Sequence, residues 1–369
     1  VADSQSSYLR QQSNLAASIS GNLTGSTGSK IEVGKIFRLQ VVSSGSPEDG
    51  GNINVPVEAW ANDTGGNAIG YVLASNSISG DITCKLPTVT ESEHASITSI
   101  FVGPGENTAG ITGRILAPLG SIDEIRCSGP IAITSSESAP GIHAGVGVKL
   151  IYTGELPAPS NDSLPTTAYD IDAFIKVGSA PLATHRLEKL RTNGDLKNAV
   201  LANAIQPPTT GSGGETWGIW VGGTIEKPID VTTDVFVAVI RGATFAAGSE
   251  TTPPADVTIG RFLKGTVEAA YRTATSVTYG DLQTVTVGRD SESDLAGMGG
   301  VDPSDQDPEG VIRAANIENV DIKRMYLQWD KSDPPLVQAD TIGSLVIDEF
   351  YTGAVGGLPG DPQDPPTYA

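Results

Sequence analysis

The chain has 369 residues, which is enough for two ordinary domains, each with its own buried core. Its 43 acidic and 23 basic residues give a net charge of −20, which disfavours direct binding to nucleic acid because the phosphates would be repelled. No run of about 20 apolar residues is present to span a bilayer. The acidic composition suits a high-salt habitat, and it suits an ordinary acidic protein nearly as well.

Residues 1–30 are polar and are predicted to form an N-terminal arm. Tyr8, Leu15 and Ile19 would lie on one face of a short amphipathic helix within it. The segment lacks the apolar core of a secretory signal peptide. We therefore interpret it as an arm that either extends freely or docks on a partner.

Residues 31–155 contain about eight short apolar stretches separated by turns rich in Gly, Asn, Asp and Pro. This spacing is typical of a β-sandwich or a barrel. The last stretch, Val146–Glu155, places apolar side chains at every second position and is expected to be the final strand of a first domain.

Residues 156–168 are rich in Pro and Ser and are predicted to be a linker. A second set of strand-like stretches follows over residues 169–354. It ends in Leu345–Ala354, which matches the end of the first half, and a Pro-rich tail occupies residues 355–369. The two halves therefore indicate a duplicated β-domain.

Residues 183–206 are predicted to interrupt the second half with two helices. Leu187 and Leu190 would share one face of the first helix, and Asp195 would cap the second. A helix-turn-helix that reads DNA is one interpretation, but the pair is only weakly basic, and a helical insertion that covers a sheet edge is favoured. The predicted fold class is all-β, with two tandem β-sandwich domains and this insertion in the second.

The sequence shows no arrangement of catalytic residues. His94, His143 and His185 lie in unrelated contexts and are interpreted as surface or capping residues. The GPGENTAG segment at residues 103–110 lacks the Gly-Lys-Ser/Thr ending of a phosphate loop, and motifs of serine hydrolases and zinc proteases are missing. The chain is therefore predicted not to be an enzyme and to need no cofactor.

One segment, DPSDQDPEG, brings four carboxylates close together and is the candidate metal site, with structural calcium as the ion. A solvated acidic loop is the favoured alternative, because the spacing differs from the helix-loop-helix calcium pattern and the prolines stiffen the segment. Cys84 and Cys127 are interpreted as buried free thiols, with a disulfide as the alternative. The four carboxylates of the candidate metal site are those of Asp302, Asp305, Asp307 and Glu309.

Three tryptophans support a different class of function, a secreted carbohydrate-binding or carbohydrate-active β-protein. Trp60, Trp217 and Trp220 could each stack on a sugar ring, with carboxylates nearby. Trp217 and Trp220 fall on opposite faces of one strand, so a division between core and interface is the alternative for that pair. Sequons for N-glycosylation occur at Asn22, Asn62 and Asn161.

Two successive β-sandwich-like halves, a polar arm, a helical insertion, long loops and missing catalytic motifs together resemble the double jelly-roll major capsid proteins of tailless icosahedral double-stranded DNA viruses. The resemblance rests on order and length over most of the chain and on no signature motif. It implies jelly rolls at residues 31–155 and 169–354. The insertion lies earlier in the second half than the helix-bearing loops usual in that family.

The same resemblance implies a structural protein that self-assembles into the viral shell. Its partners would be copies of itself, as homotrimers that form pseudo-hexameric capsomers, and other capsid proteins. Residues 1–30 would face an internal membrane or neighbouring capsomers. The protein would be assembled in the host cytoplasm and reside in the virion. A tail or spike subunit built from the same sandwiches is a variant of this hypothesis.

Overall fold

The computed structural model describes most of the chain and shows two compact units, unit 1 (Val1–Asn198) and unit 2 (Ala199–Ala369). The described residues are all in strands, turns and irregular segments, with no helix, and the predicted all-β class is confirmed. The described ranges are 8–43, 51–60, 67–85, 96–103, 109–155, 166–178, 185–206, 217–273, 275–288, 297–298, 310–327 and 335–352.

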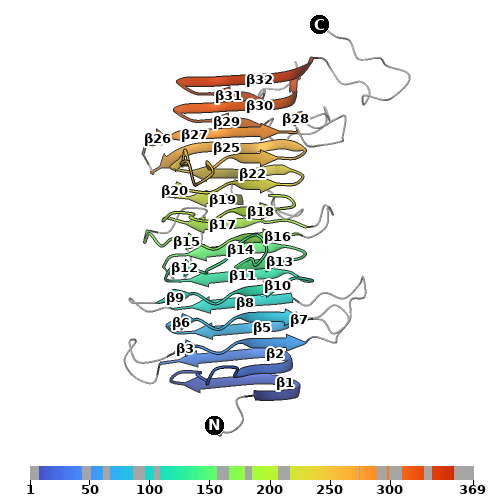
Figure 1. The fold of residues 1–369 in the computed structure, drawn as a ribbon, viewed down its shortest axis with the longest axis vertical. Coiled ribbons are helices and arrows are strands. Elements are labelled where there is room, and N and C mark those ends of the chain that lie inside the picture. The colour runs from blue at the N-terminus through green and yellow to red at the C-terminus, as the bar shows by residue number, and fades with distance from the viewer. Residues whose placement is uncertain are drawn as a thin grey trace, which may run out of the picture. The chain divides into compact units, whose positions relative to one another are not determined.

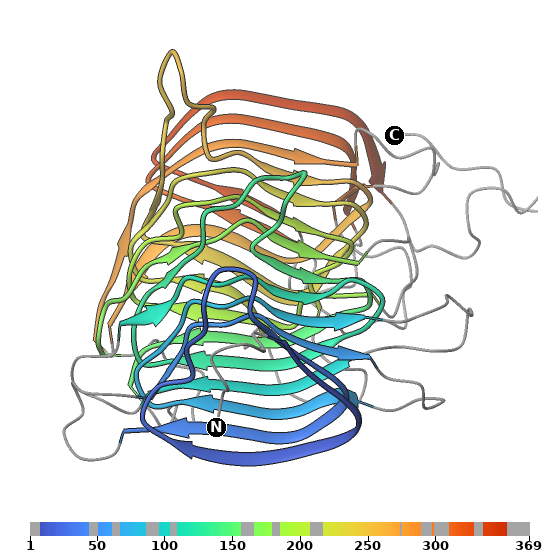
Figure 2. The ribbon, with the colours of Figure 1, turned by 60° about the horizontal axis from the view of Figure 1, so that its bottom comes forward.

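Unit 1 is a β-solenoid, in which the chain winds in coils and each strand pairs in parallel with the equivalent strand one coil later. Figure 2 shows these coils as rounded, three-sided loops at the blue end of the chain. Side A consists of the first part of β2 (Lys30–Val42), then β4 (Val57–Trp60), β7 (Ile82–Lys85), β10 (Ile115–Ala117), β13 (Ile142–Ala144) and β16 (Ile175–Val177).

Side B consists of longer strands, and side C consists of two-residue strands that close each coil (Figure 1). Before both, β1 (Tyr8–Ser20) pairs in parallel along β2 and forms the first strand of the unit. Side B contains the second part of β2, β5 (Asn67–Ala74), β8 (Ser96–Val102), β11 (Ile122–Cys127), β14 (Val148–Thr153) and β17 (Lys189–Thr192). Side C contains β3 (Asn52–Ile53), β6 (Ser77–Ile78), β9 (Gly110–Ile111), β12 (Ile131–Ala132) and β15 (Ile171–Asp172).

Aligned aliphatic side chains form the core of unit 1. Parallel pairing places equivalent residues of successive coils directly above one another, so a branched side chain in one coil packs on the next. The coils differ in length, with 25 residues from Val57 to Ile82 and 33 from Ile82 to Ile115. The buried column on side A is Ile31, Val57, Ile82, Ile115, Ile142 and Ile175.

Hydrogen bonds between side chains join the corners of successive coils in unit 1. Asn52 Nδ2 donates to Asn22 Oδ1 at 2.7 Å, and Asn76 Nδ2 donates to Asn52 Oδ1 at 2.8 Å. Such a ladder satisfies polar groups where the chain turns and the sheet hydrogen bonds end. The corners therefore fix the coil-to-coil register that the apolar columns require.

Unit 2 is also a parallel β-solenoid, with the same division into inward aliphatic columns and outward polar faces. One set of strands is β18 (Val200–Ala202), β21 (Ile229–Val231), β24 (Val257–Ile259), β27 (Asp281–Val287), β30 (Asn316–Leu327) and β32 (Thr341–Thr352). A second set is β19 (Trp217–Val221), β22 (Val235–Gly242), β25 (Phe262–Arg272), β28 (Gly297–Met298), β29 (Val311–Arg313) and β31 (Leu336–Gln338). Short strands are β20 (Thr224–Ile225) and β23 (Thr244–Phe245), and β26 (Val277–Tyr279) forms an antiparallel hairpin with β25.

The strand direction differs from that expected for jelly rolls, which are antiparallel. Among the described strands, every ladder is parallel except the β25–β26 hairpin. β14, expected to end the first domain, lies between β11 and β17 inside unit 1. The division between the units falls after Asn198, and most of the linker predicted at residues 156–168 lies outside the described residues.

The helices predicted within residues 183–206 are wrong over the described part, residues 185–206. This segment contains β17 and β18 and isolated bridges at Leu187, Leu196 and Ile205. Leu187, Leu190 and Leu196 are buried because each stacks on an apolar residue of another coil, as Leu190 stacks on Ile151. The helix predicted through Tyr8 and Ile19 is likewise wrong, since those residues lie in β1.

Candidate functional site

The candidate calcium site, residues 302–309, lies outside the described residues. Within the described part of the chain, no group of three or more Asp, Glu, His or Cys side chains could hold a metal ion. No helix that could span a membrane occurs in that part.

The cysteines and histidines are not brought together in the described structure. Cys84 and Cys127 are buried free thiols, as predicted, and burial raises the pKa of Cys127 to about 12. His143 lies on an outward-facing position of β13, where burial and the charge of Lys176 lower its pKa. His185 is buried, contrary to the expectation of a surface residue, and His94 lies outside the described residues.

The tryptophans have different environments. Trp220 is buried against the guanidinium of Arg241, which lies 4.4 Å from the ring centre. The contact of the Trp220 ring with Arg241 therefore supports a structural role for this side chain rather than an open surface for stacking on a sugar. Trp60 faces outward on β4, half-buried, with Lys85 Nζ 5.3 Å from the ring centre. The side chain of Trp217 is outside the described part.

A buried ion cluster lies on the outward face of unit 2. Glu268 on β25 is fully buried, and both Arg241 and Arg272 pair with its carboxylate, Arg272 at 2.8 Å. Burial acts to raise the pKa of Glu268, but the hydrogen bonds and charges of the two arginines outweigh it, and the pKa lies below its ordinary value. Trp220, Arg241 and Glu268 occupy equivalent positions in successive coils, so this cluster ties three coils together.

The last coil of unit 2 exposes the apolar columns that the inner coils bury. Val285 and Val320 are at most 1% exposed, whereas Leu345, next in the same column, is 45% exposed. Met298 and Met325 are buried in a second column, and its next member, Phe350, is 55% exposed. Among the described strands, none pairs with the outer edge of β32.

The first strand of unit 1 is another free edge among the described strands. β1 has 13 residues, pairs with β2 alone, and runs parallel to it. β32 has 12 residues and runs parallel to β30. β1 contains one basic residue, Arg10, and no acidic one, whereas β32 contains Asp348 and Glu349 and no basic one. The two edges are therefore similar in length and in type of pairing, and their charges have opposite signs.

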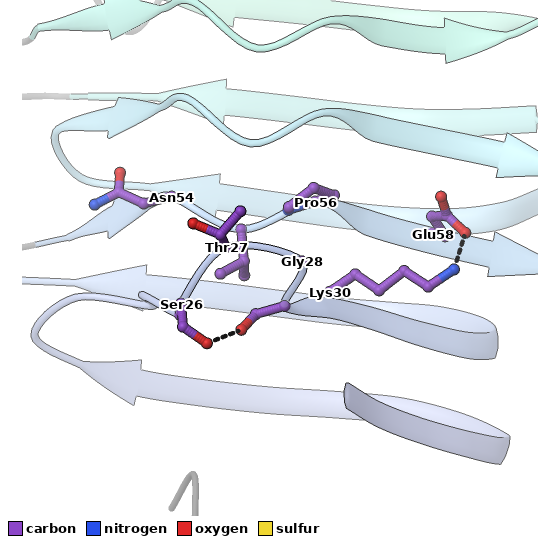
Figure 3. A pocket seen from close by; sticks show the side chains of 10 residues that line it. Ser26, Thr27, Gly28, Lys30, Asn54, Pro56 and Glu58 are labelled. Carbon is purple, nitrogen blue, oxygen red and sulfur yellow. Dashed lines mark hydrogen bonds and ion pairs between the residues drawn. The ribbon is translucent and has the colours of Figure 1, made fainter. Parts of the chain in front are cut away.

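A polar cleft of about 400 Å³ lies on the outward face of the first coils of unit 1 (Figure 3). One wall is a β-turn, in which Ser29 N donates to Ser26 O at 2.9 Å and Gly28 has a φ of +89°, a conformation that favours glycine. The facing wall comes from the next coil and contains Asn54 and Pro56.

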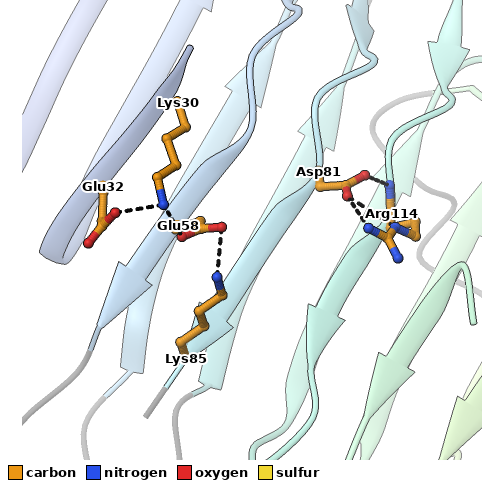
Figure 4. Close-up of polar contacts among 6 residues, drawn as sticks. All are labelled: Lys30, Glu32, Glu58, Asp81, Lys85 and Arg114. Atoms are coloured by element: carbon orange, nitrogen blue, oxygen red, sulfur yellow. Dashed lines mark hydrogen bonds and ion pairs between the residues drawn. The ribbon is translucent and has the colours of Figure 1, made fainter. Parts of the chain in front are cut away.

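Lys30 and Glu58, which line this cleft, belong to a chain of ion pairs that links three strands (Figure 4). Lys30 Nζ lies 2.8 Å from Glu32 and 3.2 Å from Glu58, and Lys85 Nζ lies 2.8 Å from the other oxygen of Glu58. Hydrogen bonds to Glu32 and then to Glu58 raise the pKa of Lys30 to about 12. The sequence could not show this cluster, because its members come from three strands that the coils bring into line.

No family model, curated protein or solved structure matches this chain. Its functional interpretation therefore rests on its own geometry.

Proposed function

We propose that this chain is a non-catalytic structural protein that self-assembles, with the last coil of unit 2 stacking on β1 of a second copy. The observation that carries the proposal is the exposure of Leu345 and Phe350 at positions where every inner coil is buried. Solenoids that stay monomeric need end coils with a polar outer face. The last coil of unit 2 has an apolar outer face instead.

The occupant of this face is proposed to be a second copy, because β1 has the properties that the edge of β32 requires. A strand added there would continue the parallel ladder, and a 13-residue strand matches the 12 residues of β32. The positive charge of Arg10 on β1 would lie near the acidic residues of β32, Asp348 and Glu349, of which Glu349 also pairs with Arg324 of β30 at 2.7 Å. Contacts between two different surfaces repeat without closing, unless a rotation closes a ring, so filaments or rings are expected.

The major capsid subunit expected from the sequence is a finer version of this proposal. The capsid hypothesis depends on two antiparallel jelly rolls and on homotrimer formation. The strands within both units pair in parallel, so the structure does not support the jelly rolls on which the hypothesis depends. The present proposal keeps only the self-assembly of the capsid hypothesis. Purified protein examined by sedimentation velocity and electron microscopy tests it: elongated or ring-shaped assemblies support the proposal, whereas a monomer at all concentrations, or a dimer that grows no further, refutes it.

A further inference from the structure

The cleft beside Lys30 has the lining of a site for a hydroxyl-rich ligand. Its walls offer the hydroxyls of Ser26, Thr27 and Ser29, and the exposed amide of Asn54. Hydroxyl and amide groups both donate and accept hydrogen bonds, as sugar hydroxyls do. A volume of about 400 Å³ lies within the usual range of pockets that hold small molecules.

The charges of the cleft are balanced, which disfavours an anionic ligand. Lys30 is held by two carboxylates, and Lys85 is held by one of them, Glu58. Two ammonium groups thus face two carboxylates, so a phosphate or sulfate would meet as much repulsion as attraction. A neutral ligand can use both the donors and the acceptors of these ion pairs, and hydrogen bonds to charged groups are the stronger kind.

An aromatic side chain continues the same face. Trp60 lies two residues beyond Glu58 on β4, and alternation along a strand places both side chains outward, about 7 Å apart. Lys85 joins them, because its ammonium group contacts Glu58 and lies over the Trp60 ring. An indole ring beside paired charges provides an apolar surface next to polar groups, which suits the two kinds of surface of a pyranose ring.

We propose that this face is a binding site for a neutral glycan chain, with one sugar unit in the cleft between Asn54 and the Lys30–Glu58 pair and the next unit against Trp60. The carboxylate of Glu58 accepts hydrogen bonds from sugar hydroxyls, and Lys30 donates to a sugar oxygen. Asn54, whose Oδ1 is held by the hydroxyl of Ser79 at 2.9 Å, presents its amide from the opposite wall. The site lies within unit 1 and does not depend on the assembly proposed above.

The test is a glycan array that carries neutral, uronic-acid and sulfated oligosaccharides, probed with the full chain. The variants are Glu58→Gln, Asn54→Ala and Trp60→Ala. Asp81→Asn is the matched control, because Asp81 forms a comparable ion pair with Arg114 at 2.6 Å that does not line the cleft (Figure 4). Circular dichroism and thermal unfolding identify any variant that fails to fold, and Asn54→Ala removes a cleft group without touching the ion pairs.

Binding of neutral oligosaccharides by the wild type is expected, with a loss of at least about tenfold in affinity for each cleft variant, equivalent to about 1.4 kcal/mol, and none for Asp81→Asn. Three results would overturn the proposal: no bound glycan, binding of sulfated or uronic-acid glycans alone, or equal binding by all folded variants. Repeating the array with an assembly-deficient variant, Leu345→Lys/Phe350→Lys, separates affinity at this site from avidity in an assembly.

Discussion

Replacing Leu345 and Phe350 together by lysine should weaken self-association strongly. Complete burial of a leucine or phenylalanine side chain contributes about 1.5–3 kcal/mol. Leu345 is 45% and Phe350 55% exposed, so about half of that contribution, roughly 1 kcal/mol each, remains to be gained when a second copy covers them. Loss of about 2 kcal/mol corresponds to a dissociation constant about thirtyfold higher. Because a lysine placed in an apolar contact also costs desolvation energy, this is a lower bound.

Sedimentation velocity over a range of concentration measures the effect, and Phe37→Lys is the matched control. Phe37 is 52% exposed, nearly as much as Phe350, but belongs to β2 of unit 1 and not to the last coil of unit 2. The double variant should stay small at concentrations where the wild type and Phe37→Lys assemble. Unchanged assembly of the double variant, or equal loss in Phe37→Lys, would show that the last coil is not the contact surface.

Two further predictions concern stability. Glu268→Gln should lower the free energy of unfolding by about 3 kcal/mol, since it leaves two arginines without their buried carboxylate partner. Because the pKa of Glu268 in the folded protein lies below its ordinary 4.5, the wild type should keep this stabilisation above pH 4.5 and lose it as the pH falls through the folded pKa. Chemical denaturation at several pH values should show that the variant lacks this part of the acid dependence. Ile100→Ala should cost about 3 kcal/mol because Ile100 is fully buried between Val72 and Ile125. Thr134→Ala, at an exposed position of the same unit, should change stability by less than about 0.5 kcal/mol, and similar urea midpoints for the two variants would contradict the assigned core.

Most strands of unit 1 could be predicted from the sequence, with β1 and β17 as exceptions, but their pairing could not. Alternation of apolar and polar residues in segments such as Ile175–Val177 is the same in parallel and antiparallel sheets. The signal of a solenoid is a fixed repeat, and here the coils between Val57 and Ile115 differ by eight residues. What repeats is one to three buried residues per side of each coil, and the segments between them vary in length, so no fixed period shows in the sequence.

The candidate sites could not be predicted from the sequence for a related reason. Leu187 and Leu190 are three residues apart, a spacing that fits one helix face and also fits a bend between two short strands. Glu58 and Lys85 are 27 residues apart, and only coil-to-coil register makes them neighbours. The apolar pattern of β32 is that of an inner strand, so its exposure follows only from its place as the last strand of the described stack.

The acidic composition leads to a final prediction, that self-assembly should strengthen with salt. Copies that each carry a net charge of −20 repel one another, and the attraction between one positive charge on β1 and two negative charges on β32 is small beside that repulsion. Raising the salt concentration from 0.1 M to 1 M shortens the screening length from about 10 Å to about 3 Å, which removes the repulsion while leaving the apolar contact of Leu345 and Phe350. Light scattering across this range should therefore show larger assemblies at high salt. If the assemblies instead dissociated, ion pairs rather than the apolar last coil would hold the copies together.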